Sequence, residues 1–223
     1  MRKTLLKLST AIMTIVMMTG CGNSSTDQNG NTFKTVKIGD QLWMAENLNV
    51  DKFRNGDPIP EASSDEDWQK ACEEGNSAWC YYDNDPDNGK RYGKLYNWHA
   101  VNDPRGLAPK GWHIPTDEEW LELTDHLGGE NIAGHKMKND KDWREKMDGS
   151  NSSGFTALPG GYRHENNSFN DMFNSASWWS STNEHGYIWF RGVHYYGRDV
   201  GRGNTTDSEG MSVRCVKDVS KKD

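Results

Sequence analysis

The chain has 223 residues, of which 33 are acidic and 26 are basic, and only 33% are hydrophobic. This composition excludes a membrane protein with several spans, because each span needs about 20 mostly apolar residues. The 10 tryptophans and 23 glycines also argue against a simple helical bundle, so we expect one or at most two domains with a core of large rings.

The first 20 residues differ from the rest of the chain. Three basic residues precede an uncharged apolar stretch at residues 8–18, which is too short for a permanent membrane span. We therefore interpret residues 1–20 as a secretory signal. The sequence Met-Thr-Gly-Cys that ends at Cys21 resembles the bacterial lipobox, with Met18 where Leu is usual, and predicts lipidation of Cys21. The alternative is an ordinary signal with an incidental cysteine.

Residues 21–32 are polar and typical of a flexible tether. An acyl chain stabilises membrane binding by about 0.8 kcal/mol per buried CH₂, so we expect attachment through lipid. Removal of residues 1–20 takes away three of the 26 basic residues and no acidic one, which leaves 23 basic against 33 acidic residues. This excess argues against a nucleic-acid partner. Gly22 is not the Asp that holds some lipoproteins at the inner membrane, which favours the outer membrane or the cell surface.

The folded domain is predicted to begin with a β-hairpin. Residues 33–38 alternate between apolar and polar, a Gly-Asp pair offers the turn, and residues 41–44 continue the pattern. Further along, Ser64 followed by three acidic residues predicts a short capped helix that ends near Gly75.

A second short helix is predicted within residues 92–101, since Leu95, Trp98 and Val101 have three-residue spacing.

The strongest helix signal begins at Thr116, which can cap the first turn while Glu119 reaches back to it. A Gly-Gly pair at 128–129 ends this helix. We interpret the neighbouring His113 as a hydrogen-bonded structural residue. The apolar face of the helix consists of Trp120, Leu123, Thr124 and Leu127.

Beyond residue 150 the chain consists of short apolar runs broken by Gly, Asn and Ser, which predicts antiparallel strands. With helices early and strands late, the predicted fold class is α+β. We expect loops at 159–161 and 201–210. The predicted strands are 154–158, 176–181, 187–196 and 211–216.

The acidic segment 83–89 could offer oxygen ligands to calcium. An EF-hand loop needs Gly at its sixth position and Glu at its twelfth, where this chain has Asn88 and Lys94. We therefore predict a solvated turn, no metal site and no cofactor, and leave calcium open at the three carboxylates. These are Asp83, Asp85 and Asp87.

Three cysteines besides Cys21 would lie in a compartment that permits disulfides. Cys72 with Cys80 would close a short loop, whereas Cys80 with Cys215 would restrict the unfolded chain more. The spacing alone does not decide between the two pairs.

A resemblance covers roughly residues 34–218. The motifs "WMAENLNV", "AWCYYDND", "YGKLYNWHAV", "LAPKGWHIPTDEEW", "GFTALPGGYR", "WWSST" and "SVRCVKD" occur in the order seen in the Fibrobacter succinogenes major paralogous domain. That family is found in secreted and lipid-anchored bacterial proteins, with no assigned biochemical role. We therefore expect the domain at residues 33–218 and a tail at 219–223.

More distantly, "GWHIPTDEEW" and the final "SVRCV" resemble formylglycine-generating enzymes and their C-type-lectin-like fold. The resemblance implies short helices packed on small antiparallel sheets with long loops. It also implies a Cys80–Cys215 disulfide, because Ala108 replaces a cysteine that members of the family often have before Pro-x-Gly-Trp-His. Those enzymes hold copper with a cysteine pair, and the C-terminal half here has only Cys215, so we expect no enzyme.

The candidate binding residues form an aromatic cluster within 178–196. Trp and Tyr offer flat apolar faces with a polar handle, which suits sugar rings and protein surfaces. In a strand, Tyr187, Trp189 and Arg191 would share one side, unless a bulge at Gly192 changes the register beyond it. We expect at least half of the rings to be buried. The candidates are Trp178, Trp179, Tyr187, Trp189, Arg191 and Tyr195.

We therefore expect a lipid-anchored protein of the outer membrane or cell surface that recognises a glycan or a protein, without catalytic residues. Two alternatives stay open, a structural surface component without a small ligand and a divergent enzyme of the formylglycine-generating type. Exposed rings that share a groove would favour binding, and buried rings would favour a structural role. A deep pocket with convergent titratable groups would favour an enzyme.

Overall fold

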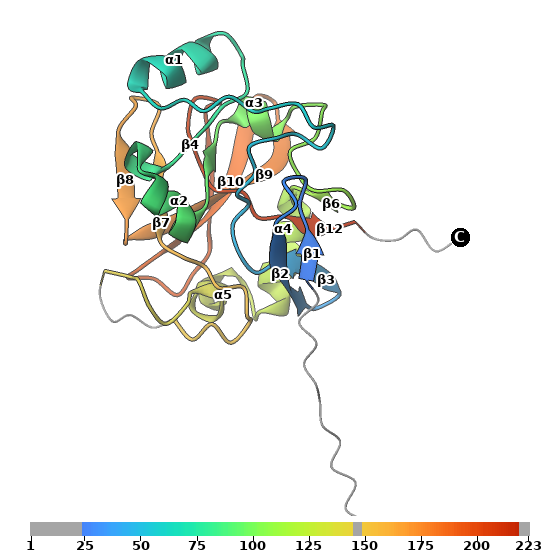
Figure 1. Ribbon diagram of the computed structural model, residues 1–223. Coiled ribbons are helices and arrows are strands. Elements are labelled where there is room, and N and C mark those ends of the chain that lie inside the picture. Colours follow the sequence, from blue (N-terminus) through green and yellow to red (C-terminus); the bar gives the residue numbers. More distant parts are fainter. Residues whose placement is uncertain (1–23, 145–148, 219–223) are drawn as a thin grey trace, which may run out of the picture.

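The computed structural model describes residues 24–144 and 149–218. The predicted signal, Cys21 and the predicted tail at 219–223 lie outside the described residues. Short helices and small sheets alternate along the described chain (Figure 1), which confirms the α+β fold class. None of the helices within this part of the chain has the length and apolar character that a membrane crossing requires.

The first sheet brings together the two ends of the described chain. Its order is β1-β2-β3-β12-β6. The predicted hairpin is confirmed as β2 and β3, but the predicted tether is wrong for residues 24–32. Here β1 pairs with β2, and Gln28 donates hydrogen bonds to the carbonyls of Lys52 and Leu107 at 2.8 Å each. The strands are β1 (Ser24–Thr26), β2 (Thr32–Ile38), β3 (Gln41–Met44), β6 (Trp112–His113) and β12 (Val216–Lys217).

The second sheet has the order β11-β10-β9-β7-β8 and contains the longest strands. The predicted strands at 176–181 and 187–196 are confirmed by β9 and β10. Both predicted loops were wrong, because β7 and β11 form there by pairing beside β9 and β10. The strands are β7 (Gly160–Arg163), β8 (Phe169–Met172), β9 (Ser175–Glu184), β10 (Tyr187–His194) and β11 (Gly201–Thr205).

Two other predicted strands need correction. Residues 154–158 make only an isolated bridge, between Lys138 and Ala157. Of residues 211–216, only Val216 belongs to a named strand, because the residues before it make single bridges to Tyr96 and Trp178. A third, two-stranded sheet joins β4 (Trp79–Cys80) to β5 (Leu95–Tyr96), so Leu95 is not helical.

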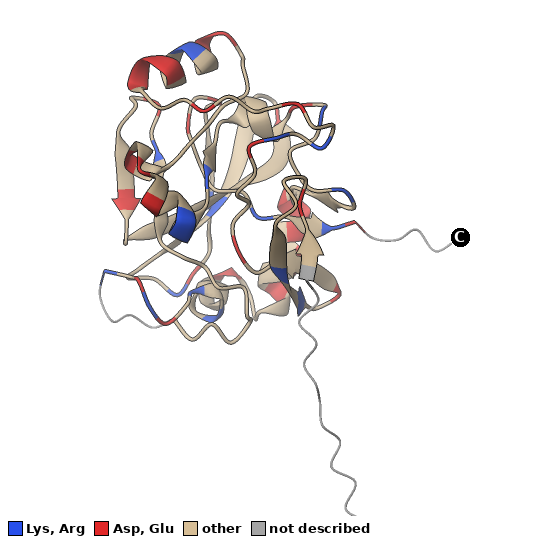
Figure 2. Ribbon diagram, in the orientation of Figure 1, with Lys and Arg blue, Asp and Glu red and all other residues tan. Residues whose placement is uncertain are grey.

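The helices begin where side chains cap them. The predicted helices after Ser64 and Thr116 are confirmed, and the Thr116 and Glu119 side chains form the full capping box. Acidic residues gather on α1 (Figure 2). The helical elements are α1 (Asp65–Glu73), the 3₁₀ turn η1 (Tyr82–Asn84), α2 (Pro86–Tyr92), α3 (Trp98–Val101), α4 (Asp117–His126) and α5 (Glu130–Met137).

The acidic segment 83–89 folds into η1 and α2, so the predicted solvated turn was wrong. Asp85 caps α2 by accepting a hydrogen bond from the Asp87 N–H at 2.9 Å, and Pro86 occupies the first turn, where its missing N–H costs nothing. Asp87 pairs with Lys90 at 2.6 Å. Two of the three carboxylates considered for calcium therefore already have protein partners.

Large rings fill the core, as predicted. Trp43 and Trp120 lie 4.8 Å apart, and Phe155 packs edge-on against Trp178 at 5.5 Å. Arg214 is fully buried among these rings, and its Nη1 donates to the carbonyls of Met44 and Phe155. Burial lowers the pKa of this guanidinium to about 9. The core thus contains a cation held by carbonyls and ring faces.

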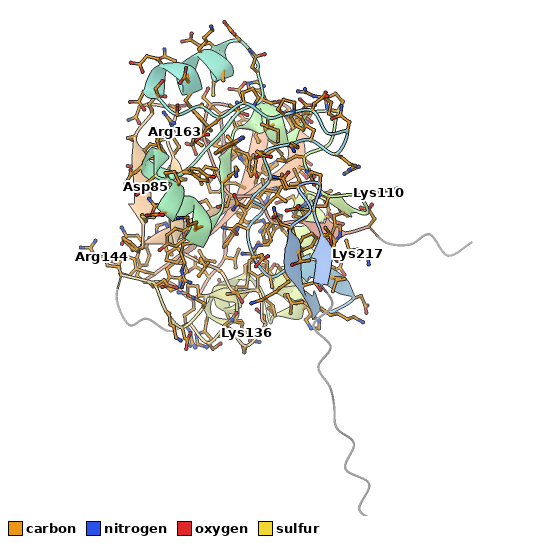
Figure 3. All side chains as sticks on the ribbon, viewed as in Figure 1. Asp85, Lys110, Lys136, Arg144, Arg163 and Lys217 are labelled. Carbon is orange, nitrogen blue, oxygen red and sulfur yellow. The ribbon has the colours of Figure 1, made fainter. Side chains whose placement is uncertain are left out.

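The three described cysteines are buried and unbonded, which corrects the expected Cys80–Cys215 disulfide. The two side chains belong to different parts of the core: Cys80 packs with Cys72 and Trp68 under α1, whereas Cys215 lies in the larger cluster around the first sheet. Burial raises the pKa of the Cys80 thiol to about 12. Figure 3 labels Arg163 below α1, where its guanidinium lies 4.8 Å from the Trp68 ring.

Candidate functional site

The second sheet has two faces that differ in what covers them. Side chains alternate along β10, so Phe190, Gly192 and His194 point to one face, which we call the groove face. Arg191 and Val193 point to the other, which packs against α4 and α5 and is called the helix face.

The helix face holds charged side chains in contact with each other. Arg191 is 1% exposed, and its guanidinium lies 2.8 Å from an Asp117 oxygen on α4 and 2.5 Å from a Glu130 oxygen on α5. Arg202 of β11 bonds the other Asp117 oxygen at 2.8 Å. The interpretation of Arg191 as a ligand-binding residue was therefore wrong, because its guanidinium forms ion pairs that link α4 and α5 to the sheet.

The predicted aromatic platform is also largely buried. Trp178 and Trp179 are both 0% exposed. Trp178 packs in the core beneath α4 and donates from Nε1 to Asn47 at 2.9 Å, and Trp179 donates to the Tyr96 carbonyl at 2.7 Å. Neither can present a face to a ligand, so both predictions were wrong.

The other predicted rings differ in how exposed they are. The register of β10 against β9 shifts between Ile188 and Phe190, and the bulge considered at Gly192 does not occur. Arg202 covers the half-buried Trp189 ring at 3.4 Å. Tyr187 is 57% exposed at the start of the strand, and Tyr195 is half-buried at its end. Trp189 and Arg191 therefore do not form a shared exposed surface.

The groove face instead carries two adjoining hollows of about 280 and 190 Å³. Together we call them the groove. The residues that line both hollows are Ser175, Ser177, Phe190 and His194. The first hollow is completed by residues at β7 and β8, at the end of β11 and just beyond it, which are Tyr162, His164, Asp171, Asn204, Thr205, Glu209 and Met211. The second is completed toward β11, by Gly192, Asp199, Gly201, Arg202 and Gly203.

Missing side chains create the second hollow. Gly192 lies opposite Ser177 on β9 and opposite Gly201 on β11, so small residues cross three strands in one row. A Cβ atom at Gly192 would meet no atom closer than 3.5 Å, so this strand position has room for a side chain. At Gly203 a Cβ would lie 2.6 Å from the Phe190 ring, so this glycine is required for ring packing.

Two buried polar atoms at the groove have no hydrogen-bond partner among the described residues. Ser175 is 2% exposed and its Oγ is unpartnered, and so is Nδ1 of His194. An unsatisfied buried polar group costs about 1–3 kcal/mol. A water molecule or a ligand in the hollow would satisfy such groups.

The carboxyl of Glu209 borders the same hollow and is 9% exposed. Burial raises its pKa, although a hydrogen bond with Thr205 opposes the rise. Burial also raises the pKa of Tyr162, with the Asp171 and Glu209 carboxylates adding to the effect. The described residues contain no group of three His, Cys, Asp or Glu side chains placed to hold a metal ion.

An exposed ring stacks on His194, one of the residues that line the groove. Tyr196 is 65% exposed and stacks on His194 with ring centres 5.0 Å apart and planes at 26°. The sequence pointed to the neighbouring Tyr195 and not to Tyr196. Ser175 and Ser177 of β9 and Gly192 of β10 could have indicated the groove, because they leave one face of the sheet without bulky side chains there.

The family model described as the Fibrobacter succinogenes major domain matches residues 36–217. The match begins within β2 and ends in β12, so it includes the second sheet, the groove and most of the first sheet but not β1. No curated protein and no solved structure matches the chain significantly.

Proposed function

The chain belongs to the Fibrobacter succinogenes major domain family, and from this premise we propose that it is a lipid-anchored recognition module of the outer membrane or cell surface. Its ligand is a glycan or a protein, bound without catalysis. The observation that carries the proposal is the groove with the buried, unpartnered Ser175 hydroxyl.

The place of the predicted anchor supports the same function. Cys21 precedes Ser24, where β1 begins, by three residues, which span about 10 Å when extended. A lipid on Cys21 would therefore hold the first sheet close to the bilayer. Figure 1 places β1–β3 on one side of the molecule and β7 and β8 on the other. The groove belongs to this second sheet and stays accessible to a ligand.

We also propose a C-type-lectin-like architecture for the domain. Short helices and long connections between two sheets, and the antiparallel pairing of β12 beside β3, support it. An experimental structure would test this proposal by superposition on lectin-like domains.

A glycan array tests recognition most directly. The full chain, purified in a detergent without a sugar headgroup, is expected to bind a subset of glycans. An array that carries proteins and peptides from the bacterial envelope provides the second arm. Binding on neither array contradicts the proposed recognition function.

Radioactive palmitate tests the anchor independently. Cells that produce the wild-type chain should incorporate the label, and cells that produce Cys21→Ser should not. The matched control is Cys72→Ser, which leaves the predicted lipidation site intact. Equal labelling of wild type and Cys21→Ser would contradict the lipid anchor but would leave the groove proposal intact.

A further inference from the structure

We infer that the first hollow of the groove binds the basic side chain of a protein or peptide partner. This inference rests on the proposed recognition function and narrows its ligand from a glycan or a protein to one class. It depends on three properties of the hollow: a buried carboxylate without a cationic partner, a lining without Lys or Arg among the described residues, and aromatic rings beside the carboxylates.

The first property is the burial of Glu209. The residue lines the hollow and is only 9% exposed. Acidic side chains are almost never buried to this extent unless they are paired. Thr205 supplies a hydrogen bond, but no described Lys, Arg or His forms an ion pair with Glu209. The buried Arg163 and Arg191, by contrast, both pair with carboxylates. A cation in the hollow would supply the partner that Glu209 lacks among the described residues.

The second property is the negative charge around the hollow. Asp171 also lines it, and none of the described lining residues is a Lys or an Arg. Burial raises the pKa of the Tyr162 hydroxyl, and the carboxylates of Asp171 and Glu209 add to the rise, so the two charges act on the same part of the hollow. His164 does not offset them, because its Nδ1 accepts a hydrogen bond from the Asn166 N–H at 3.2 Å and so carries no proton. A concave surface lined by one sign of charge attracts the opposite sign.

The third property is the apolar part of the lining, which suits a hydrocarbon stem. Tyr162 and Phe190 line the hollow as half-buried rings that pack against the larger core cluster. Ring faces attract ammonium and guanidinium groups. Lys and Arg carry their charge at the end of an apolar stem, so the charged group can meet the carboxylates while the stem contacts the rings. An amino sugar has no such stem, because its charge lies on the pyranose ring itself. The lining therefore favours a basic side chain.

Matched amino-acid amides test the need for positive charge. Acetyl-lysine methylamide and acetyl-norleucine methylamide have the same four-carbon stem and differ by the ammonium group. Acetyl-arginine methylamide is the guanidinium probe, and methyl glucosaminide is the amino-sugar probe. The full chain, in a non-ionic detergent without a sugar headgroup, is titrated with each of the four by saturation-transfer NMR. The lysine or the arginine probe should bind, and the norleucine probe should bind at least tenfold more weakly than the better of the two.

Isosteric variants test the two carboxylates. Glu209→Gln and Asp171→Asn each remove one charge and keep the side-chain shape, and Asn tolerates the left-handed backbone of residue 171, where φ is 62°. Each should weaken the better basic probe about tenfold or more, the range of a hydrogen bond to a charged group. Glu184→Gln, at the exposed end of β9, is the matched control and should change binding less than twofold. Because Glu209 has no cationic partner to lose among the described residues, the urea midpoint of Glu209→Gln should not fall below that of the wild type.

The outcomes separate this inference from the function on which it rests. Equal or tighter binding of the norleucine probe overturns the inference, and so does basic-probe binding that survives both Glu209→Gln and Asp171→Asn. A lower urea midpoint in Glu209→Gln also overturns it, because the carboxylate would then have a structural partner. If neither basic probe binds but methyl glucosaminide, a glycan or an envelope protein does, the inference is overturned and recognition stands. Binding to no probe, glycan, protein or peptide overturns both.

Discussion

The two faces of the second sheet are built from the same strands, but a buried polar residue on one face has protein partners and a buried polar residue on the other has none among the described residues. On the helix face, Arg191 is buried and bonded to two carboxylates. One residue later, Gly192 opens a hollow, and nearby Ser175 keeps an unpartnered hydroxyl. Arg191 and Ser175 are almost equally buried, and they differ in that Arg191 has protein partners whereas Oγ of Ser175 has none among the described residues.

The difference has a physical basis in what each face must do. A covered face gains stability only when its polar groups are satisfied, because a buried charge or donor without a partner is costly. A binding face can carry such a cost when a ligand supplies the partner, and the rest of the fold supplies the stability that is lost. The helix face should therefore respond to substitution by losing stability, and the groove face by losing binding.

The largest effect is expected from Trp178→Ala on the helix face. Its ring is fully buried against Trp120 and Phe155, so the substitution leaves a large cavity and should lower the free energy of unfolding by about 4 kcal/mol. Urea denaturation measures the loss. Trp189→Ala, a half-buried ring on the adjacent strand, is the control and should cost less than half as much. Equal losses would mean that burial does not separate these positions.

A smaller loss is expected from Arg191→Leu. The substitution leaves Glu130 without this partner and leaves one Asp117 oxygen without its guanidinium, so it should destabilise the protein by about 3 kcal/mol, as for other broken buried pairs. Arg202→Leu is the matched control, since it bonds the same Asp117 from a more exposed position and should cost less than about 1 kcal/mol. Urea midpoints of both variants check the ranking, and equal effects would contradict it.

Local signals in the sequence predicted the elements that local chemistry specifies. Thr116 and Glu119 predicted the capping box of α4, and the alternating pattern of residues 33–38 predicted β2. The glycine-rich strand β11 was missed, because it exists through its pairing with β10 and not through its own propensity.

The sequence did not predict which residues line the candidate groove. The sequence correctly indicated an aromatic-rich sheet region near residue 190, yet Trp178 and Arg191 are buried and the candidate groove is lined by serines and glycines. Which face α4 and α5 cover is a long-range property, and the sequence reveals it only through alternation. The residue types of Trp178 and Arg191 therefore suggested ligand binding, but both side chains are buried on the helix face.

The third prediction tests the groove face and has the opposite sign. Ser175→Ala removes a hydroxyl with no partner in the described chain, so the free energy of unfolding should stay the same or rise by up to about 1 kcal/mol. Ser180→Ala on the same strand is the control, because Oγ of Ser180 accepts a hydrogen bond from the Thr182 N–H at 3.1 Å. This control should lose about 1 kcal/mol. If Ser175→Ala destabilises as much as Ser180→Ala, the hydroxyl has a structural partner and the contrast between the faces fails.

The smallest effect concerns how the stability contributed by the contact between His113 and the first turn of α4 depends on pH. His113 lies between two carboxylates, 2.7 Å from Oε1 of Glu119 and 2.7 Å from Oδ1 of Asp218. The contact with Glu119 links β6 to the first turn of α4. The bond to Glu119, with that to Asp218, raises the pKa of His113 above its ordinary value of 6.5, although burial opposes this. Because the folded state binds the proton more tightly than the unfolded state, this stabilisation is complete below pH 6.5 and is lost as the pH rises through the raised pKa.

The free energy of unfolding should therefore fall in the wild type as the pH rises above 6.5, and His113→Asn should reduce that fall. The difference should stay below about 1 kcal/mol, because solvent reaches the imidazole and screens the pair. His185→Asn, in the exposed turn between β9 and β10, should keep the wild-type slope. Urea titrations at several pH values measure all three. An unchanged slope in His113→Asn would mean that the pairs at α4 do not contribute to the stability of the helix face, and that its stability comes from the packed rings and the Arg191 contacts.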